Sequence, residues 1–289
     1  MALSTTGPIS FNDVNVELGL TATATLALGA SSVRGLAGVA SGPISLADLC
    51  GKANEITFTN TVQRVDASIF SLMGSPTAAG NYVFVNQANI YSTATFALRT
   101  GVFPAGSTLK IINQNYIRGK GGKGGSLYGS LYTTDPTPGE PGQAALYLDM
   151  PVSIVNAEGF IWGGGGGGGM LMYYTSGGFF NDLYGGGGGA GQLVGPGGTV
   201  FEYPDETTGN PGTLSAGGAG KEGTAYPGTR TSGNGGSPGA VGQTASDVAE
   251  DKPPSSVVGG VGGRAIQLNG KSITWISGNN TTRVKGAVS

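Results

Sequence analysis

Acidic side chains adjoin one another in one segment of the chain, and they are the first candidates for chemistry. Glu202, Asp205 and Glu206 could pair as carboxylates for acid–base catalysis. Adjacent acidic residues in a polar loop are usually just solvated, so we do not expect a catalytic pair here. The chain has no histidine, which excludes His-based triads and His–metal sites. Cys50 is the only cysteine, so a disulfide framework and a thiolate metal cluster are excluded as well.

The glycine-rich stretches do not have the pattern of a phosphate-binding loop. They lack the Gly-Lys-Ser/Thr ending, and the stretch that begins at Gly119 opens no recognisable helix. We therefore expect no enzyme: no catalytic residue, no metal and no cofactor. Only 11% of the residues are charged and the formal net charge is −2, so a nucleic-acid partner is not expected either.

Aromatic and aliphatic side chains gather in the segments between the glycine runs. Loops rich in Tyr, Ser and Gly on a firm support have the composition of antibody paratopes, because aromatic side chains give large contacts at low entropic cost. These aromatics could instead cover the glycine runs and meet no partner, but glycine backbones need little aromatic cover, which favours binding. The candidate binding residues are Tyr128, Tyr132, Met170, Met172, Tyr173, Tyr174, Phe179, Phe180, Tyr184, Phe201, Tyr203 and Tyr226.

Glycine runs must position these segments. Seven consecutive glycines extend from Gly163 to Gly169, and shorter runs recur between residues 119 and 263. Ordering each residue costs on the order of 1–2 kcal/mol, so a run can be ordered only if its backbone groups gain partners together. Polyproline-II geometry permits this, because every N–H and C=O points outward and glycine lets neighbours approach closely. A seven-residue run would be about 22 Å long at ~3.1 Å per residue.

We therefore predict a sandwich of packed polyglycine-II helices with exposed loops. Flexible linkers are the alternative. Linkers, however, need neither the aromatic residues beside the runs nor the strand patterns before and after them. The glycines expected to pack inside the sandwich include Gly121, Gly122, Gly163, Gly166, Gly169, Gly185, Gly187, Gly189, Gly218, Gly236 and Gly260.

Strand patterns flank the glycine runs. Alternation and β-rich composition predict strands over 56–59, 82–85, 94–98 and 108–112, whereas 65–73 has helical spacing. Repeated strands around inserted glycine loops predict stacked rungs of one β platform.

Short repeats support these rungs. An aromatic–Ile–x–Gly pattern begins at Tyr116, Phe160 and Trp275, each time after a β-rich approach. The stretches 142–148 and 263–268 also resemble each other. Asn269-Gly270 is a two-residue hairpin signal that would close the last rung.

The first 54 residues form a module of their own. Gly7–Val14 recurs as Gly42–Leu49, and each copy predicts a turn followed by a serine N-cap with an aspartate three residues on. Residues 31–37 predict another short helical turn. A module with so little apolar bulk would struggle to fold alone, which favours docking onto another chain. The candidate attachment residues are Ile9, Phe11, Ile44 and Leu46.

Residues 1–6 lack the basic and apolar regions of a signal peptide, and no apolar run approaches the ~20 residues that span a bilayer. We expect a soluble protein made in a cytoplasm. The fold class expected is mainly β with irregular parts, in four segments. These are a helical module (1–54), a β platform (55–118), a glycine-rich domain (119–263) and strands returning to the platform (264–289).

The stretch from Phe103 to Gly125, the run from Gly163 to Gly169 and the motif Gly263-Arg264-Ala265-Ile266 resemble the tail-fibre tip adhesins of T-even-like bacteriophages. The resemblance covers roughly Thr95 to Ser289 and depends mainly on the glycine-run architecture. The repeated Gly-Pro-Ile-Ser motif is similar to modules at the start of many phage virion and tail proteins, and it departs from the attachment domain of the T-even adhesins.

This resemblance implies a polyglycine-II sandwich whose distal loops recognise a host surface receptor, which in that family is typically an outer-membrane protein. We expect the receptor of this chain to be an outer-membrane protein or a glycan. The resemblance also implies a phage tail-fibre or tail protein as the partner of the N-terminal module. The protein would be synthesised in the host cytoplasm and would lie in the virion, at the tail or fibre tip.

Two other functions are compatible with the composition. One is a structural virion protein, such as a head fibre, collar or decoration protein, with the glycine block as a rigid spacer. The other is an antifreeze-like polyglycine sandwich, which would expose a flat, regular Thr or Ala face. The bulky segments between the runs argue against the second.

Overall fold

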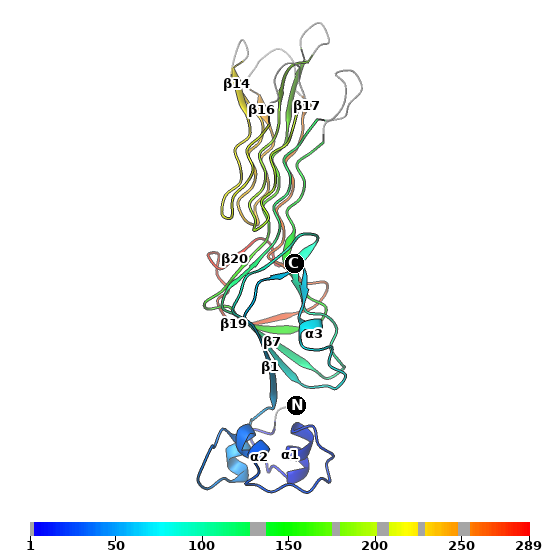
Figure 1. Cartoon of the computed structure of the whole chain (residues 1–289), viewed down its shortest axis with the longest axis vertical. Helices are drawn as coiled ribbons and strands as arrows, with labels where there is room; N and C mark the ends of the chain where they lie inside the picture. The colour runs from blue at the N-terminus through cyan, green and yellow to red at the C-terminus, as the bar shows by residue number, and fades with distance from the viewer. Residues whose placement is uncertain (1–2, 128–136, 175–179, 201–207, 225–228, 248–254) are drawn as a thin grey trace.

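The computed structural model describes residues 3–127, 137–174, 180–200, 208–224, 229–247 and 255–289. These residues form a long rod (Figure 1). Short helices lie at one end, β-sheets lie in the middle, and the glycine runs extend to the other end. The chain is mainly β with few helices, as predicted.

Three short helices form the N-terminal module. They are α1 (Phe11–Glu17), α2 (Ser31–Ala37) and the 3-10 helix η1 (Leu46–Leu49). Both repeated motifs begin a helix with the predicted capping box: the Ser10 N–H donates to the Asp13 carboxylate at 2.8 Å, and Ser45 and Asp48 repeat the contact. Hydrogen bonds from the hydroxyl and backbone of Ser10 lower the pKa of Asp13. The buried core of the module includes Leu3, Ile9, Val14, Val33, Leu36, Ala37 and Leu49.

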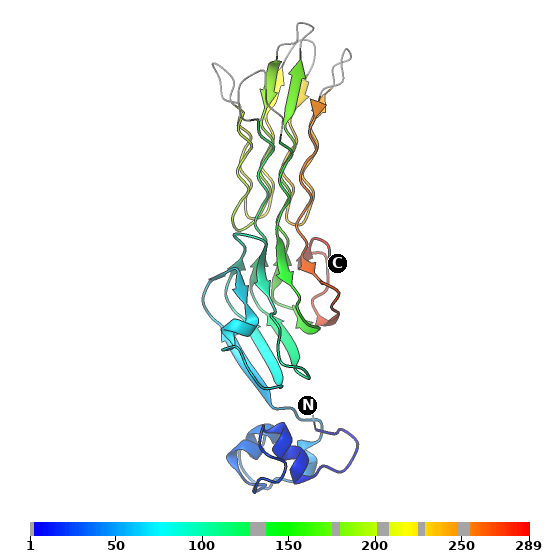
Figure 2. The same cartoon turned by 90° about the vertical axis from the view of Figure 1, so that its right-hand side faces the viewer.

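Three parallel sheets make up the β platform, and the chain passes from one to the next. The first contains β1 (Glu55–Asn60), β4 (Asn81–Asn86), β7 (Thr108–Asn113), β10 (Val152–Val155) and β19 (Ile273–Ser277). The second contains β2 (Arg64–Val65), β5 (Ile90–Tyr91), β8 (Tyr116–Arg118), β11 (Phe160–Trp162) and β20 (Val284–Lys285). The third contains β3 (Ala67–Ser68), β6 (Phe96–Arg99), β9 (Ala144–Tyr147) and β18 (Ile266–Gln267). The chain therefore winds as a three-sided parallel β-helix, whose rungs lie side by side in Figure 2.

Columns of apolar side chains fill the interior of this β-helix. Ile111 pairs in register with Phe84 on one side and with Ile154 on the other, and all three are fully buried. Ile117 and Ile161 form an equivalent buried pair in the second sheet. Stacked rungs thus share one continuous core.

A ladder of buried asparagines follows the first strand of successive rungs. The amide nitrogen of Asn60 donates to the side-chain oxygen of Asn86 at 3.0 Å, Asn86 donates to Asn113 at 2.9 Å, and Asn113 donates to Asn156 at 2.8 Å. Because all four side chains are buried, each amide depends on its neighbours for its hydrogen bonds.

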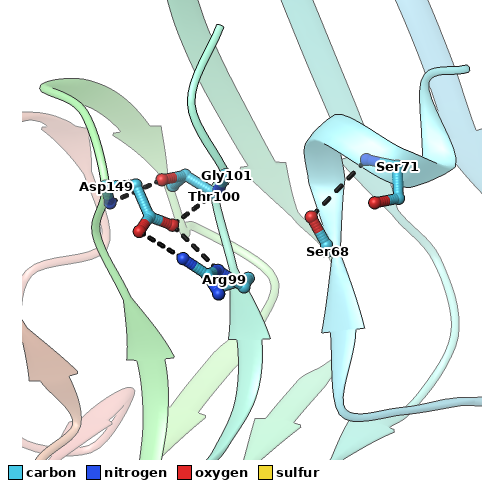
Figure 3. Close-up of polar contacts among 6 residues, drawn as sticks. All are labelled: Ser68, Ser71, Arg99, Thr100, Gly101 and Asp149. Atoms are coloured by element: carbon cyan, nitrogen blue, oxygen red, sulfur yellow. Dashed lines mark hydrogen bonds and ion pairs between the residues drawn. The ribbon is translucent and has the colours of Figure 1, made fainter. Parts of the chain in front are cut away.

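An ion pair ties two rungs together at another corner (Figure 3). Arg99 donates to the Asp149 carboxylate from Nε at 3.1 Å and from Nη2 at 2.6 Å. The Gly101 N–H donates to the same carboxylate at 2.8 Å, with Gly101 in the left-handed region at φ 74°. The hydrogen bond with Asp149 raises the pKa of Arg99. In the same view, Ser68 caps the short helix α3 (Ile69–Leu72).

Two local predictions are only partly correct. The helical spacing over 65–73 holds for α3 alone, because Ala67 and Ser68 form β3 and complete the first rung. Asn269 and Gly270 form the predicted turn, with φ 50° and 71°. The strands they join, β18 and β19, lie in different sheets, so the turn closes no hairpin.

The pattern match at Trp275 is wrong. Trp275 lies in β19 and pairs with Ile154, so it belongs to a different sheet from Tyr116 and Phe160. The strand next to β11 is β20, where Val284 pairs with Ile161. Its sequence, Arg283-Val284-Lys285-Gly286, keeps the central aliphatic residue and the glycine but has arginine in place of the aromatic residue.

The glycine runs are two insertions into the β-helix. Residues 144–162, which fall inside the predicted glycine-rich segment, contain β9, β10 and β11 and pair with the platform sheets. The runs therefore occupy 119–143 and 163–264, each between the second and third strand of a rung. Both insertions leave and rejoin the β-helix at the same corner.

The asparagine ladder yields a stability prediction. Asn113→Leu leaves the Asn86 amide nitrogen and the Asn156 side-chain oxygen buried without partners, so we expect a loss of about 2–5 kcal/mol. The urea midpoint of the full chain measures this loss. Gln114→Ala is the control, because Gln114 is exposed at the next position and should change stability by at most ~0.5 kcal/mol. Equal midpoints for the two variants would contradict the ladder's role.

Candidate functional site

Two strands of the β-helix continue directly into glycine runs. β8 and β11 pair in parallel, with Arg118 opposite Trp162. Beyond them the neighbouring runs keep this alignment, but their hydrogen bonds now repeat every three residues. The N–H to C=O pairs are Gly119 to Trp162, Gly122 to Gly165 and Gly125 to Gly168, each at 2.8 Å. The β-helix thus sets the register of the runs.

The run from Gly163 to Gly169 lies inside the bundle of runs. From Gly164 to Gly169 its N–H groups donate to three neighbouring segments, at residues 140 and 143, 187 and 190, and 240 and 243, whereas the Gly163 N–H donates to the Lys285 carbonyl. Its C=O groups accept from three others, at residues 122 and 125, 233 and 236, and 260 and 263. These bonds measure 2.7–3.0 Å, and every backbone group from Gly164 to Gly169 has a partner. Six segments therefore surround this run.

The contacts of this run repeat with a period of three. A Cβ added at residues 163, 166 or 169 would overlap the carbonyls of residues 263, 260 and 257. At 164 and 167 it would overlap those of Lys120 and Lys123, and at 165 and 168 those of Gly236 and Gly233. No direction around the run leaves room for a side chain.

The other glycines predicted to pack inside the block have the same surroundings. An added Cβ would overlap a backbone oxygen of a neighbouring segment at Gly121, Gly122, Gly187, Gly189, Gly218, Gly236 and Gly260. Gly185 is buried, and its carbonyl accepts a 2.7 Å hydrogen bond from the Ser232 hydroxyl.

Small apolar clusters lie at the far end of the runs. Met170, directly after the seven glycines, is fully buried against Leu127 and Val200. Tyr184 is 8% exposed and packs with Leu171 and Ala245. Met170 and Tyr184 therefore pack inside the molecule at the base of the distal segments. The prediction that they contact a partner is corrected, because both side chains are buried. Each follows or precedes a glycine run, where the first side chain meets neighbours on all sides.

The segment between these clusters is a hairpin rather than the irregular loop expected. β12 (Leu171–Tyr174) pairs antiparallel with β13 (Phe180–Tyr184) and with β17 (Ser255–Ser256). The predicted residues Met172, Tyr173, Tyr174 and Phe180 lie in these strands. A second distal sheet contains β14 (Glu222–Thr224), β15 (Thr229–Thr231) and β16 (Ser246–Asp247). Aromatic and β-branched residues favour such pairing once the glycines end.

The remaining predicted binding residues lie outside the described part of the chain. They are Tyr128, Tyr132, Phe179, Phe201, Tyr203 and Tyr226, and the acidic residues Glu202, Asp205 and Glu206 lie outside it as well.

The attachment residues are divided between core and surface. Ile9 is buried, and Ile44 and Leu46 pack partly buried against the same core, so these three mainly hold the module together. Phe11 is 39% exposed, as expected of a docking residue. Val16 and Leu20 on the same module are also exposed, although the sequence analysis did not single them out.

A recess of about 300 Å³ adjoins this exposed apolar surface of the module. It is lined by Leu3, Ser4, Pro8, Ile9, Asp13, Val16 and Glu17.

Within the described residues, no group of three acidic, histidine or cysteine side chains could hold a metal ion. In the same part of the chain, no helix has the length and apolar character needed to cross a bilayer.

Comparison with known proteins identifies the family. A family model described as phage tail fibre adhesin Gp38 matches residues 53–288. The chain belongs to the Gp38 phage tail fibre adhesin family. The match to Gp38 covers the β-helix and the glycine runs and begins where the N-terminal module ends.

This Gp38-family chain is also similar to a solved structure, the crystal structure of the gp37-gp38 adhesin tip complex of the bacteriophage S16 long tail fiber. The two chains are 22% identical, the alignment covers 99% of this chain and 100% of that chain, and the TM-score is 0.58. At this identity the likeness shows a shared fold. A search of curated proteins found no match.

The crowded surroundings of Gly166 generate a prediction. Gly166→Ala places a methyl group on the Gly260 carbonyl, so neighbouring backbone must move, and we expect a loss of at least about 3 kcal/mol or failure to fold. Thermal unfolding of the full chain measures it. The control Ala219→Val enlarges an exposed side chain in the same block and should be nearly neutral. A Gly166→Ala chain as heat-resistant as wild type would contradict the close packing.

Proposed function

We propose that this Gp38-family chain binds a host cell-surface receptor, an outer-membrane protein or a glycan, through its distal segments. The observation that carries the proposal is the position of the aromatic residues. Met172, Tyr173, Tyr174 and Phe180 lie on antiparallel strands directly beyond a bundle of glycine runs, in which every backbone group from Gly164 to Gly169 is hydrogen-bonded. Aromatic residues held at the end of a firm support lose little entropy on binding.

We further propose that the support is a sandwich of polyglycine-II helices. The contacts of Gly163–Gly169 repeat every three residues, which is the period of this helix. Its N–H and C=O groups point outward to six neighbours, as a helix without internal hydrogen bonds requires. The glycine-rich runs within 119–263 would then hold the binding segments in fixed positions, at a distance from the β-helix. The strands of 55–118 and 264–289 would anchor these runs.

The N-terminal module (1–54) is proposed to attach the adhesin to a phage tail-fibre or tail protein. The S16 adhesin of similar fold was solved in complex with gp37. In this chain, Phe11, Val16 and Leu20 expose apolar surface on the module beside the recess, at the end of the rod opposite the distal strands. The chain would then lie at the tip of a fibre or tail in the virion, after synthesis in the host cytoplasm.

Receptor binding is tested at the distal hairpin. Replacing Tyr173, Tyr174, Phe179 and Phe180 by Ser removes the proposed anchors, and we expect adsorption of the phage to fall at least about a hundredfold. Adsorption rate to host cells measures this, with electron microscopy confirming intact particles. The control Val241→Ser with Val258→Ser removes exposed apolar side chains from other parts of the glycine block and should adsorb normally. Normal adsorption by the hairpin variant would refute the assignment.

Attachment is tested separately at the module. Phe11→Ser with Val16→Ser should give particles that lack the adhesin, because the apolar docking surface is lost, while the purified variant still binds host cells. Immunoblots of purified particles measure retention. The control Val102→Ser changes an apolar side chain that is 69% exposed on the β-helix and should be retained. Full retention of the module variant would place the attachment surface elsewhere.

A further inference from the structure

The outer face of the second sheet carries a set of aromatic and basic side chains, near the point where the glycine runs leave the β-helix. We call this set the aromatic–cation row, and its members are Tyr116, Arg118, Phe160, Trp162, Arg283 and Lys285. Strand register places Arg118, Trp162 and Lys285 side by side on β8, β11 and β20. Arg118 is buried, and the other five are partly exposed.

Aromatic rings hold the cations of this row in place. Tyr116 and Phe160 stack at 4.6 Å between centroids. The Arg118 guanidinium lies 3.7 Å from the Tyr116 ring centre, and the Lys285 ammonium lies 4.1 Å from that of Trp162. Arg283 lies 5.2 Å from the ring centre of Phe160. Such cation–π contacts fix the positions of the charges without neutralising them.

No carboxylate in the described part of the chain pairs with these three cations. Arg118 donates to the Gln192 side-chain oxygen at 2.8 Å, and Arg283 donates to the Gly159 carbonyl at 3.1 Å. The Lys285 ammonium has no hydrogen-bond acceptor among the described residues, so its donors are available. In a chain of net charge −2, this is a local concentration of positive charge with unused donors.

We propose that the aromatic–cation row is a second binding site, which takes phosphate groups carried on an oligosaccharide. Ammonium and guanidinium groups form short, charge-assisted hydrogen bonds with phosphate oxygens. Cations already lie against the Tyr116, Phe160 and Trp162 rings, which disfavours base stacking and with it single-stranded nucleic acid.

The position of the row along the rod determines which phosphate-bearing ligands can reach it. The seven-glycine run begins directly after Trp162 and is about 22 Å long. If the distal segments touch the cell surface, as the proposed function states, a ligand must project roughly 20 Å outward to reach the row. A phosphorylated oligosaccharide chain can do so, whereas a phospholipid headgroup in the membrane plane cannot.

Isothermal titration of the full chain tests the proposal. The probe is deacylated, phosphorylated oligosaccharide from host lipopolysaccharide, and the same material treated with phosphatase is its control. We expect binding of the phosphorylated probe that weakens with added salt, and at least about tenfold weaker binding of the dephosphorylated one.

Two variants assign the binding to the row. The double variant Lys285→Gln with Arg283→Gln should weaken binding at least about tenfold. Lys285→Arg, in a chain that keeps Arg283, retains the positive charge and should bind nearly as tightly as wild type. Lys271→Gln, on the turn between β18 and β19, is the control and should bind as wild type. Unchanged melting temperatures separate this loss from a structural effect of the cation–π contacts.

Three results would overturn the proposal: no binding by the wild-type chain, equal binding of the dephosphorylated probe, or undiminished binding by the double variant. The outcome is independent of receptor binding, because the Tyr173, Tyr174, Phe179 and Phe180 variant should still bind the probe. Preferential binding of phospholipid vesicles or single-stranded DNA would also overturn the proposal, because the ligand would then belong to another class.

Discussion

Buried backbone is the constraint on which this molecule depends. A glycine run has no side chains to bury, so its only large interactions are hydrogen bonds and close contacts of the main chain. An unpaired N–H or C=O inside the block costs about 1–3 kcal/mol, and no side chain is present to compensate. From Gly164 to Gly169 every group is paired, and the partners come from six different segments. The runs can therefore be ordered only together.

The β-helix meets this requirement by fixing where the runs begin. β8 and β11 are already paired in parallel, and the hydrogen bonds of Gly119, Gly122 and Gly125 carry the same alignment into the glycine block. At the far end the first side chains, among them Met170 and Tyr184, close the block with apolar contacts. The distal strands start from this fixed layer. The β-helix, the glycine runs and the distal strands are thus consecutive parts of one structure, in which each part sets the geometry of the next.

Short repeated elements could be predicted from the sequence better than contacts between segments that lie far apart in the chain. The capping motifs at Ser10 and Ser45 and the rungs around Tyr116 and Phe160 could be found because their signals are local. Trp275 was misplaced because an aromatic–Ile–x–Gly match ignores which sheet a strand joins, and the true equivalent has Arg283 in the aromatic position. The burial of Met170 and Tyr184 depends on segments far apart in the chain, and composition alone does not reveal it. The asparagine ladder likewise became visible only once the rungs were aligned.

Amide hydrogen exchange, resolved by residue, tests the central claim most directly. If neighbouring runs satisfy the backbone of Gly164–Gly169, these amides should exchange as slowly as those of Ile111 and Ile154 in the β-helix core, although they lack side chains. Exchange near the rate of an unstructured glycine peptide would contradict the account. It would mean that the runs are flexible linkers and that the distal strands are not held in one position.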